Sequence, residues 1–246
     1  MKKLLLFVVI ALSVTQLWSQ AEKPKEDRNF RIPLIGEPAP SFTAESTNGT
    51  INFPSDFGRK WKILFSHPQD FTPVCTTEIL ELAYLQDDFD KLGVKVVVVS
   101  TDPIDTHVLW KKSMETLNLN NRGTVKIKFP IVDDEKIAIS KQYGMIHAAS
   151  NTTKAVRGVF IIDPENIIQA IYFYPGKVGR NTDELMRMIT ALQTISADNV
   201  MTPVNWKAGN DLLVPIPPKV DANNPAVAPA GYYNPAWYLW YKKVTQ

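Results

Sequence analysis

The sequence predicts a mixed α/β fold, in which a central sheet carries helices on both faces and an extended arm follows at the C-terminus. Apolar, strand-like runs alternate with amphipathic helical segments along most of the chain, an order typical of such sheets. The run at residues 94–101, VKVVVVST, is rich in β-branched residues and suits a strand buried on both faces. The turn of Asp163, Pro164, Glu165 and Asn166 joins two late strands and predicts an antiparallel hairpin.

Apolar periodicity and turn residues place the individual elements. Six segments have the composition of strands, at residues 42–47, 61–66, 94–101, 129–132, 156–162 and 167–174. Four segments suit helices, at residues 79–92, 104–119, 135–143 and 185–195. The pair Asn48-Gly49 signals a turn after the first strand. Gly93 and Gly144 each follow a helix, where a terminating glycine is common.

The N-terminal segment has the pattern of a targeting signal rather than of a folded element. Lys2 and Lys3 precede an apolar run, and Ser19 and Ala21 supply small residues at the spacing of a signal-peptidase site. Residues 1–21 therefore predict a secretory signal peptide and an exported protein, periplasmic or secreted. An uncleaved membrane anchor is the alternative, although the apolar run is shorter than the ~20 residues of a membrane span.

The remaining chain divides into a main domain at residues 32–197 and a C-terminal arm at residues 198–246. The arm holds seven of the 18 prolines, which exclude a long helix. Its end carries six large aromatic residues, whose exposure would be costly: Tyr232, Tyr233, Trp237, Tyr238, Trp240 and Tyr241. We therefore expect an extended arm without a core of its own, packed either on its own domain or on a partner subunit.

The charge and cysteine content exclude several classes of protein. The chain has 27 Lys and Arg residues and 25 Asp and Glu residues, a formal net charge of +2. A nucleic-acid-binding protein would show a clear excess of basic residues, so the charge does not indicate this class. The single cysteine, Cys75, excludes an internal disulfide, a CxxC redox pair and a cysteine-rich zinc site. His67, His107 and His147 are scattered and isolated in the sequence, without a cluster at ligand spacing, so we expect neither a metal nor another cofactor.

The position of Cys75 favours a reactive thiolate. Pro73 suits the first turn of a helix, so Cys75 lies at or near a helix N-terminus. Unpaired backbone N–H groups and the helix dipole stabilise an anion there. In such surroundings, a thiol with an ordinary pKa of ~8.5 can ionise at roughly 3.5–7.5. The alternative is a small buried core residue, but the helix-start position and the neighbouring Thr72 favour a nucleophile.

The segment around Cys75 resembles the active-site signature of the peroxiredoxins. The string HPQDFTPVCTTE contains Pro68, Thr72 and Cys75 in the spacing P-x-x-x-T-x-x-C. Further similar strings are WKILFSH before the motif and YGM, VRGVFI, GRNTDEL and TPVNW after it. The similarity covers about residues 32–241 and is greatest to the one-cysteine peroxiredoxin 6 type.

This resemblance implies a thioredoxin-like fold and a thiol-dependent peroxidase that reduces hydrogen peroxide and alkyl hydroperoxides. Cys75 would be the peroxidatic thiolate, and Thr72 would hydrogen-bond both the thiolate and the bound peroxide. Pro68 would shield the sulfur from water, Arg157 would supply positive charge, and Arg187 would be a second, supporting arginine. Such a site must stabilise the charge that develops on the leaving oxygen, which an arginine fork can do.

Two further residues near the thiol have open roles. His67 begins the signature and is either a positioning residue at the pocket wall or a structural histidine. Glu78, one turn after Cys75, could pair with His67 or with an arginine, or could be a favourable acid in the first helical turn. The two arginines could instead lie on the protein surface and have no role at the thiol. Arg157 would then form a surface ion pair, and Arg187 would lie on an exposed face of its helix.

Two departures from the family pattern limit what the resemblance implies. The terminal aromatic segment lacks the cysteines that resolve the oxidised sulfur in some members, so a sulfenic acid on Cys75 would need an external thiol reductant. Lys60 stands where peroxiredoxin 6 has a lipase-like serine, so a phospholipase activity is not implied. The resemblance also implies a homodimer or a higher homo-oligomer, with the arm at the interface.

Two other hypotheses compete with a peroxidase. A non-catalytic holdase or structural oligomer could use the same fold, but it would not need the set Pro68, Thr72, Cys75 and Arg157. A thiol–disulfide oxidoreductase is disfavoured because the chain has no CxxC pair.

Overall fold

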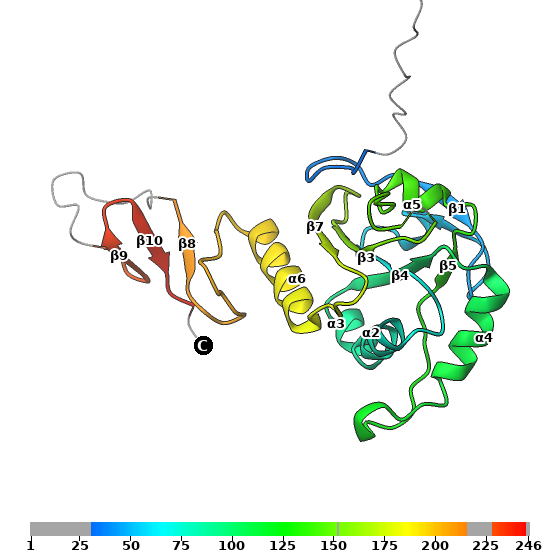
Figure 1. Ribbon diagram of the computed structural model, residues 1–246. Helices are drawn as coiled ribbons and strands as arrows, with labels where there is room; N and C mark the ends of the chain where they lie inside the picture. The colour runs from blue at the N-terminus through cyan, green and yellow to red at the C-terminus, as the bar shows by residue number, and fades with distance from the viewer. Residues whose placement is uncertain (1–30, 152, 216–227, 245–246) are drawn as a thin grey trace, which may run out of the picture. The chain divides into compact units, whose positions relative to one another are not determined.

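A five-stranded mixed sheet, with the strand order β5-β4-β3-β6-β7, forms the centre of the main domain (Figure 1). The computed structural model describes residues 31–151, 153–215 and 228–244, so the predicted signal peptide at residues 1–21 lies outside the described residues. The strands are β3 (Trp61–Ser66), β4 (Val94–Ser100), β5 (Ile131–Asp133), β6 (Arg157–Ile162) and β7 (Ile168–Tyr174). Strands β3, β4 and β5 run parallel, and β6 and β7 form the predicted antiparallel hairpin. The mixed α/β architecture is therefore confirmed.

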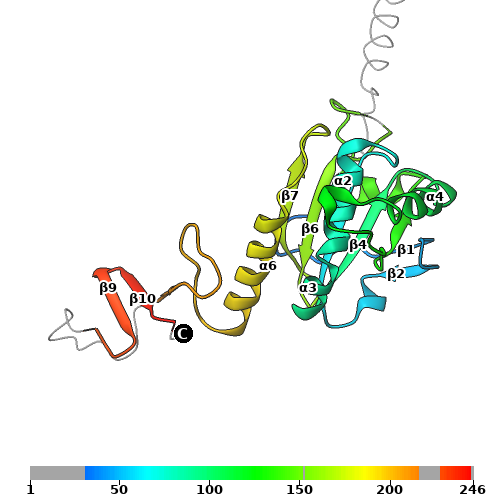
Figure 2. The same ribbon diagram turned by 90° about the horizontal axis from the view of Figure 1, so that it is seen from below.

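Helices and a small hairpin cover the two faces of this sheet (Figures 1 and 2). The elements are β1 (Phe42–Ala44), β2 (Ile51–Phe53), η2 (Ser55–Phe57), α2 (Pro73–Tyr84), α3 (Gln86–Lys91), α4 (Ile104–Met114), η3 (Leu119–Asn121), α5 (Ala138–Gln142) and α6 (Thr182–Ala197). One core joins the strands to α2, α4 and α6 through Ile79, Trp110 and Ile189. The core on the opposite face joins the strands to β2 and α5 through Phe53 and Ile139. Within the described residues, no helix combines the length and the apolar character that crossing a membrane requires.

The helix that carries the cysteine begins earlier and ends sooner than the periodic segment at residues 79–92 predicts. Helix α2 starts at Pro73, and at Leu85 the backbone closes this helix before α3 begins. The predicted terminating glycine, Gly93, has the left-handed φ of 68° and follows α3. The segment is therefore two helices, of which the first presents its N-terminus at the end of β3.

Two other helices are shorter than predicted. The helix expected at residues 104–119 ends at Met114, because Leu117 donates to the carbonyl of Met114 in a tighter turn. The helix expected from residue 135 begins only at Ala138. Its preceding residue, Ile137, has a left-handed φ of 58°, which a right-handed helix cannot include.

The C-terminal arm is extended, as predicted, but it also has packing of its own. Its strands are β8 (Leu212–Val214), β9 (Tyr232–Ala236) and β10 (Leu239–Lys242), paired antiparallel in the order β8-β10-β9. Trp206 and Leu212 form a small buried cluster with Val200 and with Ala191 of α6. Trp240 is 2% exposed. The expectation of an arm without any core is therefore wrong, because the arm buries apolar side chains in this cluster, which also packs on α6 of its own domain.

We expect Gly144→Ala to lower the free energy of unfolding by about 2–4 kcal/mol, because two penalties coincide at this position. Gly144 has a φ of +62°, and an added Cβ would lie 2.5 Å from Cγ1 and 2.7 Å from Cα of Ile32. Gly123→Ala is the matched control, since Gly123 has a φ of +84° with open space around it and should cost only about 1–2 kcal/mol. Urea denaturation compares the two variants, and equal losses would contradict the predicted contact with Ile32.

Candidate active site

Cys75 lies at the start of α2, where the chain turns back after β3. Pro73 occupies the first helical position, where its missing N–H is no loss, and Thr72 precedes the helix with an extended backbone. Cys75 is therefore in the first turn, 1% exposed and free of any disulfide. The helix-start position predicted from the sequence is confirmed.

Arg157, the first residue of β6, reaches the sulfur from the neighbouring strand. Its Nη1 lies 3.3 Å from Sγ of Cys75 and 2.6 Å from Oε2 of Glu78. Its Nε and Nη2 donate to the carbonyl of Gly176, at 3.1 and 2.8 Å. The guanidinium is 2% exposed. Arg157 is thus a buried residue whose fork is fixed by three partners, and the surface ion pair considered for it is wrong.

Glu78 connects Arg157 to a second buried arginine, Arg180. Oε1 of Glu78 accepts from Nε of Arg180 at 2.8 Å, and Oε2 accepts from Nη2 at 2.7 Å. Burial alone would raise the pKa of Glu78, but the hydrogen bonds and charge of Arg180, with the charge of Arg157, hold this pKa below its usual value. Of the alternatives for Glu78, pairing with an arginine is therefore correct.

The buried guanidinium of Arg180 also contacts two backbone carbonyls and an aromatic ring. Its Nη1 donates to the carbonyls of Ser66 and Gly158 at 2.8 and 3.0 Å, and its guanidinium lies over the ring of Phe65. Burial lowers the pKa of Arg180 to about 10, although Glu78 opposes the shift, so the group stays charged at neutral pH. Because two guanidinium groups share one carboxylate, the cluster carries an excess positive charge beside Sγ that favours an anion at the sulfur.

The supporting arginine predicted from the sequence, Arg187, is the wrong residue. Arg187 lies on α6 and pairs with Glu184 one turn earlier, at 2.6 Å, and it contacts the carbonyl of Trp206. Its helix-surface alternative is therefore correct. Arg180 stands in the string GRNTDEL just before α6, outside the apolar helical pattern that predicts the supporting arginine at residue 187.

Thr72 and Pro68 lie in the loop between β3 and α2. The Oγ1 of Thr72 donates to the carbonyl of Gln69 at 2.9 Å. Among the described residues it forms no hydrogen bond with Cys75, so the predicted donation to the thiolate requires this hydroxyl to rotate. Pro68 is half-buried, and its shielding of the sulfur stays a prediction.

His67 is fully buried and bonds to Asp70 rather than to Glu78, with 2.7 Å between Nε2 and Oδ1. His107 reaches the other oxygen of the same carboxylate at 2.6 Å. The interpretation of His107 as an isolated histidine is therefore wrong, because α4 brings it to a residue 37 positions earlier in the chain. Among the described residues His67 forms no hydrogen bond with Cys75, so its positioning role stays a prediction beside the structural one.

A histidine and two carboxylates could be considered for a metal ion. Ligand atoms of His67, Asp70 and Asp102 lie within 4.8 Å of one another. The carboxylate of Asp70 is shared by two histidine rings, however, and Asp102 accepts from Lys154 and from the backbone of Asp70. These atoms already have partners of their own, so the donor set does not fit a metal ion.

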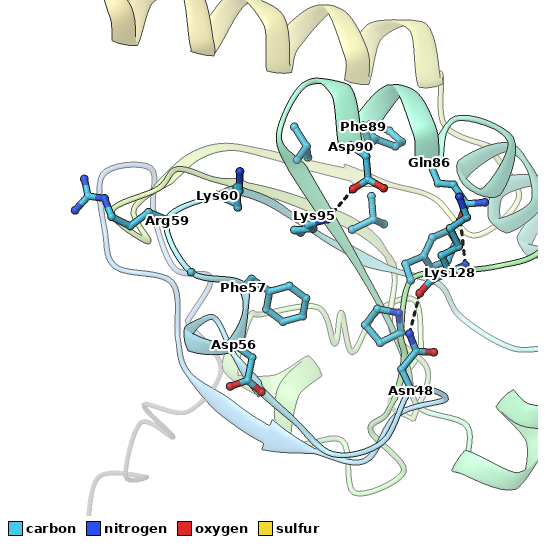
Figure 3. Close-up of a pocket in the computed structure, with 15 residues that line it drawn as sticks. Asn48, Asp56, Phe57, Arg59, Lys60, Gln86, Phe89, Asp90, Lys95 and Lys128 are labelled. Atoms are coloured by element: carbon cyan, nitrogen blue, oxygen red, sulfur yellow. Dashed lines mark hydrogen bonds and ion pairs between the residues drawn. The ribbon is translucent and has the colours of Figure 1, made fainter.

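A cavity of about 570 Å³ lies at the other end of the parallel strands, around their first residues (Figure 3). Phe57 points into it, and Lys95 on its wall pairs with Asp90 at 2.7 Å. Lys60 lines this cavity at the position that a lipase-like serine would take. The cavity therefore presents a lysine where hydrolysis would need a nucleophilic hydroxyl.

Comparison with known proteins places the chain in a family. Residues 35–171 match the AhpC/TSA family, and the chain is 43% identical over 218 residues to a peroxiredoxin of Methanosarcina mazei. That alignment covers 87% of this chain and 100% of the archaeal protein. The chain therefore belongs to the peroxiredoxins of the AhpC/TSA family, and it is a thiol-dependent peroxidase with a single cysteine.

Solved structures of a 1-Cys peroxiredoxin and of a peroxiredoxin 6 are similar to this chain. The structure of a yeast mitochondrial 1-Cys peroxiredoxin superposes with a TM-score of 0.74 at 35% identity, covering 86% of this chain and 100% of that one. The peroxiredoxin 6 of Arenicola marina, solved as a cysteine-to-serine mutant, gives 0.75 at 32% identity and covers 87% and 99%. The thioredoxin-like fold predicted from the resemblance is confirmed by these similarities.

We expect Arg180→Ala to destabilise the protein by about 3 kcal/mol or more, because Glu78 loses one of its two buried partners. Arg187→Ala is the matched control on the same stretch of chain. Its ion pair with Glu184 is partly exposed, so the loss should stay below about 1 kcal/mol. Denaturant titrations of both variants, with peroxidase assays alongside, compare the two arginines. A larger loss of stability and activity in Arg187→Ala than in Arg180→Ala would contradict this assignment and support Arg187 as the second arginine of the site.

Proposed function

We propose that this peroxiredoxin reduces hydrogen peroxide and alkyl hydroperoxides through Cys75, and that an external thiol recycles the oxidised sulfur. The observation that carries the proposal is the buried Sγ of Cys75 with Nη1 of Arg157 at 3.3 Å. The excess positive charge of Arg157, Arg180 and Glu78 favours a thiolate, which is the nucleophilic form of cysteine. The same charge stabilises an oxyanion next to the sulfur.

The oxidation step transfers one oxygen atom to the sulfur. The thiolate of Cys75 attacks one peroxide oxygen, and the S–O bond forms as the O–O bond breaks with its electron pair on the second oxygen. This oxygen leaves as hydroxide or alkoxide and takes a proton from water. Sulfur is oxidised to sulfenic acid, while the peroxide is reduced to water or an alcohol. Arg157 is placed to stabilise charge on both the sulfur and the leaving oxygen.

Recycling needs two equivalents of a thiol from outside the chain, because Cys75 is the only cysteine. The sulfenic acid condenses with the first thiol to a mixed disulfide and water, and the second thiol releases Cys75 as a disulfide leaves. The yeast 1-Cys peroxiredoxin is resolved via glutathione/thioredoxin systems. Low-molecular-weight thiols and thioredoxin-type proteins are therefore the reductants to test first.

Two further parts of the proposal concern location and assembly. The signal-like residues 1–21 support export to the periplasm or the medium, and N-terminal sequencing of the protein from its producing cells tests this cleavage. Two of the six aromatic residues of the arm, Trp237 and Tyr238, are 75% and 70% exposed, and their rings meet edge to face with centroids 5.5 Å apart. Exposed aromatic surface of this size supports a contact with a second copy of the chain.

Stoichiometric peroxide, added without any thiol, should leave one additional oxygen on the peptide that contains Cys75. The reason is that the oxidised sulfur has no cysteine within the chain to react with. Mass spectrometry after digestion measures the added oxygen, and adding a thiol should restore the reduced peptide. Cys75→Ser is the control and should consume no peroxide. An unmodified Cys75 peptide in protein that still turns over peroxide would contradict the assignment.

The double variant Trp237→Ser, Tyr238→Ser should shift the protein from dimer to monomer, with a dissociation constant raised about 30-fold or more. Each aromatic can bury 150–250 Å², a large part of the ~800 Å² that a partner contributes to a standard interface, and aromatic hot spots are worth about 2 kcal/mol or more. Sedimentation equilibrium measures the mass. Val204→Ser, at an exposed apolar residue away from the turn between β9 and β10, is the control. Unchanged association in the double variant would exclude these two residues from the interface.

A further inference from the structure

Asp70 lies between two histidine rings in the interior of the protein. Oδ1 of Asp70 lies 2.7 Å from Nε2 of His67, and Oδ2 of Asp70 lies 2.6 Å from Nδ1 of His107. Nε2 of His107 lies 3.1 Å from the carbonyl oxygen of Val132. The side chains of the three residues are at most 1% exposed. The peroxidase steps described above use neither Asp70 nor His107.

The partners of the two rings determine where their protons lie. Burial alone would raise the pKa of Asp70, but hydrogen bonds from His107 and His67 hold it below its usual value. Asp70 is therefore a carboxylate, which can only accept, and the carbonyl of Val132 can also only accept. Both ring nitrogens of His107 thus face oxygens that only accept, and an imidazolium is the form of this ring that can donate to both. Burial lowers the pKa of His67, so its ring is neutral with the proton on Nε2.

The loop that contains Asp70 has a strained backbone. Phe71, the next residue, has a φ of 54°, which bulky side chains rarely adopt. Its ring is 56% exposed, so burial of this side chain does not impose the conformation. Strain of this kind persists only where the surrounding contacts hold it. The contacts of the neighbouring Asp70 hold the loop in this shape, together with the hydrogen bond from Thr72 to the carbonyl of Gln69 and the contact between the rings of Phe71 and Trp110.

Asp70 is held through its main chain as well as its side chain. Its backbone N–H donates to Oδ2 of Asp102 at 2.7 Å, and Asp102 pairs with Lys154 at 2.7 Å through its other oxygen. The titratable and charged groups around Asp70 are thus the two histidines and the Asp102–Lys154 pair, and the charge of Arg180 also acts on His67. Thr72, which precedes α2, follows directly after the strained residue, so a shift of Asp70 would pass along the backbone to Thr72.

We propose that His107 is a positioning residue of the peroxidase: its imidazolium holds Asp70, and Asp70 holds the strained loop that places Pro68 and Thr72 at the thiol. The inference rests on the peroxidase function proposed above. His107 acts through Asp70, since both of its ring nitrogens have partners other than Cys75. Without this cation the buried carboxylate of Asp70 loses its compensating charge, and the loop is free to relax toward a negative φ.

His107→Asn tests the proposal, because its amide can still donate to Asp70 but carries no charge. The rate constant for reaction of Cys75 with hydrogen peroxide should fall about 100-fold, as expected when the groups around a reacting atom are displaced. Alkylation of the same thiol by iodoacetamide needs only an accessible thiolate and should keep its rate. An unchanged peroxide rate would overturn the proposal, and so would an equal loss in both reactions.

A second substitution tests whether the loss acts through the loop. In the double variant His107→Asn, Phe71→Gly, glycine adopts the positive φ without strain, so most of the peroxide rate should return. A double variant as slow as His107→Asn alone would overturn the proposal. His147→Asn is the matched control, since this histidine contacts Phe173 rather than Asp70 and its loss should leave the peroxide rate unchanged.

The protonation of the rings can be measured directly in the wild-type protein, whether or not the variants fold. Nitrogen-15 spectra of the imidazole groups at neutral pH should show both nitrogens of His107 protonated and His67 protonated on Nε2 only. A neutral His107 ring would overturn the proposal. These spectra do not depend on catalysis, so they test the role of His107 by itself. The peroxide assay of the wild-type protein tests the proposed function separately.

Discussion

The chemistry of this peroxiredoxin depends on one buried carboxylate that two arginines share. Glu78 comes from the same helix as Cys75, Arg157 from the start of β6, and Arg180 from the segment before α6. One carboxylate cannot neutralise two guanidinium groups, so a positive charge is left for the sulfur and for the peroxide oxygen that leaves when the O–O bond breaks. The same carboxylate fixes the orientation of both forks, which makes the geometry of the site part of the packing of three elements.

Charge and shape at the thiol come from different parts of the structure. The arginine cluster supplies the positive charge beside Cys75 and lies toward β6 and α6. The loop between β3 and α2 supplies Pro68 and Thr72, and its backbone is held by a separate polar network centred on Asp70. Because the two networks share few groups, substitutions should be able to alter the position of the loop without removing the charge.

The pattern of apolar and turn residues along the chain was sufficient to predict most of the fold and the position of the reactive cysteine. Strands β3, β6 and β7 follow from apolar runs and a turn, and the placement of Cys75 follows from Pro73 at the first helical position. The helix boundaries could not be predicted from this pattern. A residue with a left-handed φ, such as Ile137 before α5, sets a helix boundary without changing the spacing of apolar residues. Local composition reports which surface is buried, but it carries little information on where a backbone reverses.

The family, the reactive cysteine and the arginine at the start of β6 can be predicted from the sequence, because these residues stand in short motifs whose local structure fixes their place. The folded chain was needed to show that Arg180 rather than Arg187 supports the site, and that His107 belongs to the network of Asp70. The physical reason is that both choices depend on which side chains meet across the interior from distant segments. Periodicity within one segment cannot distinguish a side chain that reaches inward from one that pairs on its own helix.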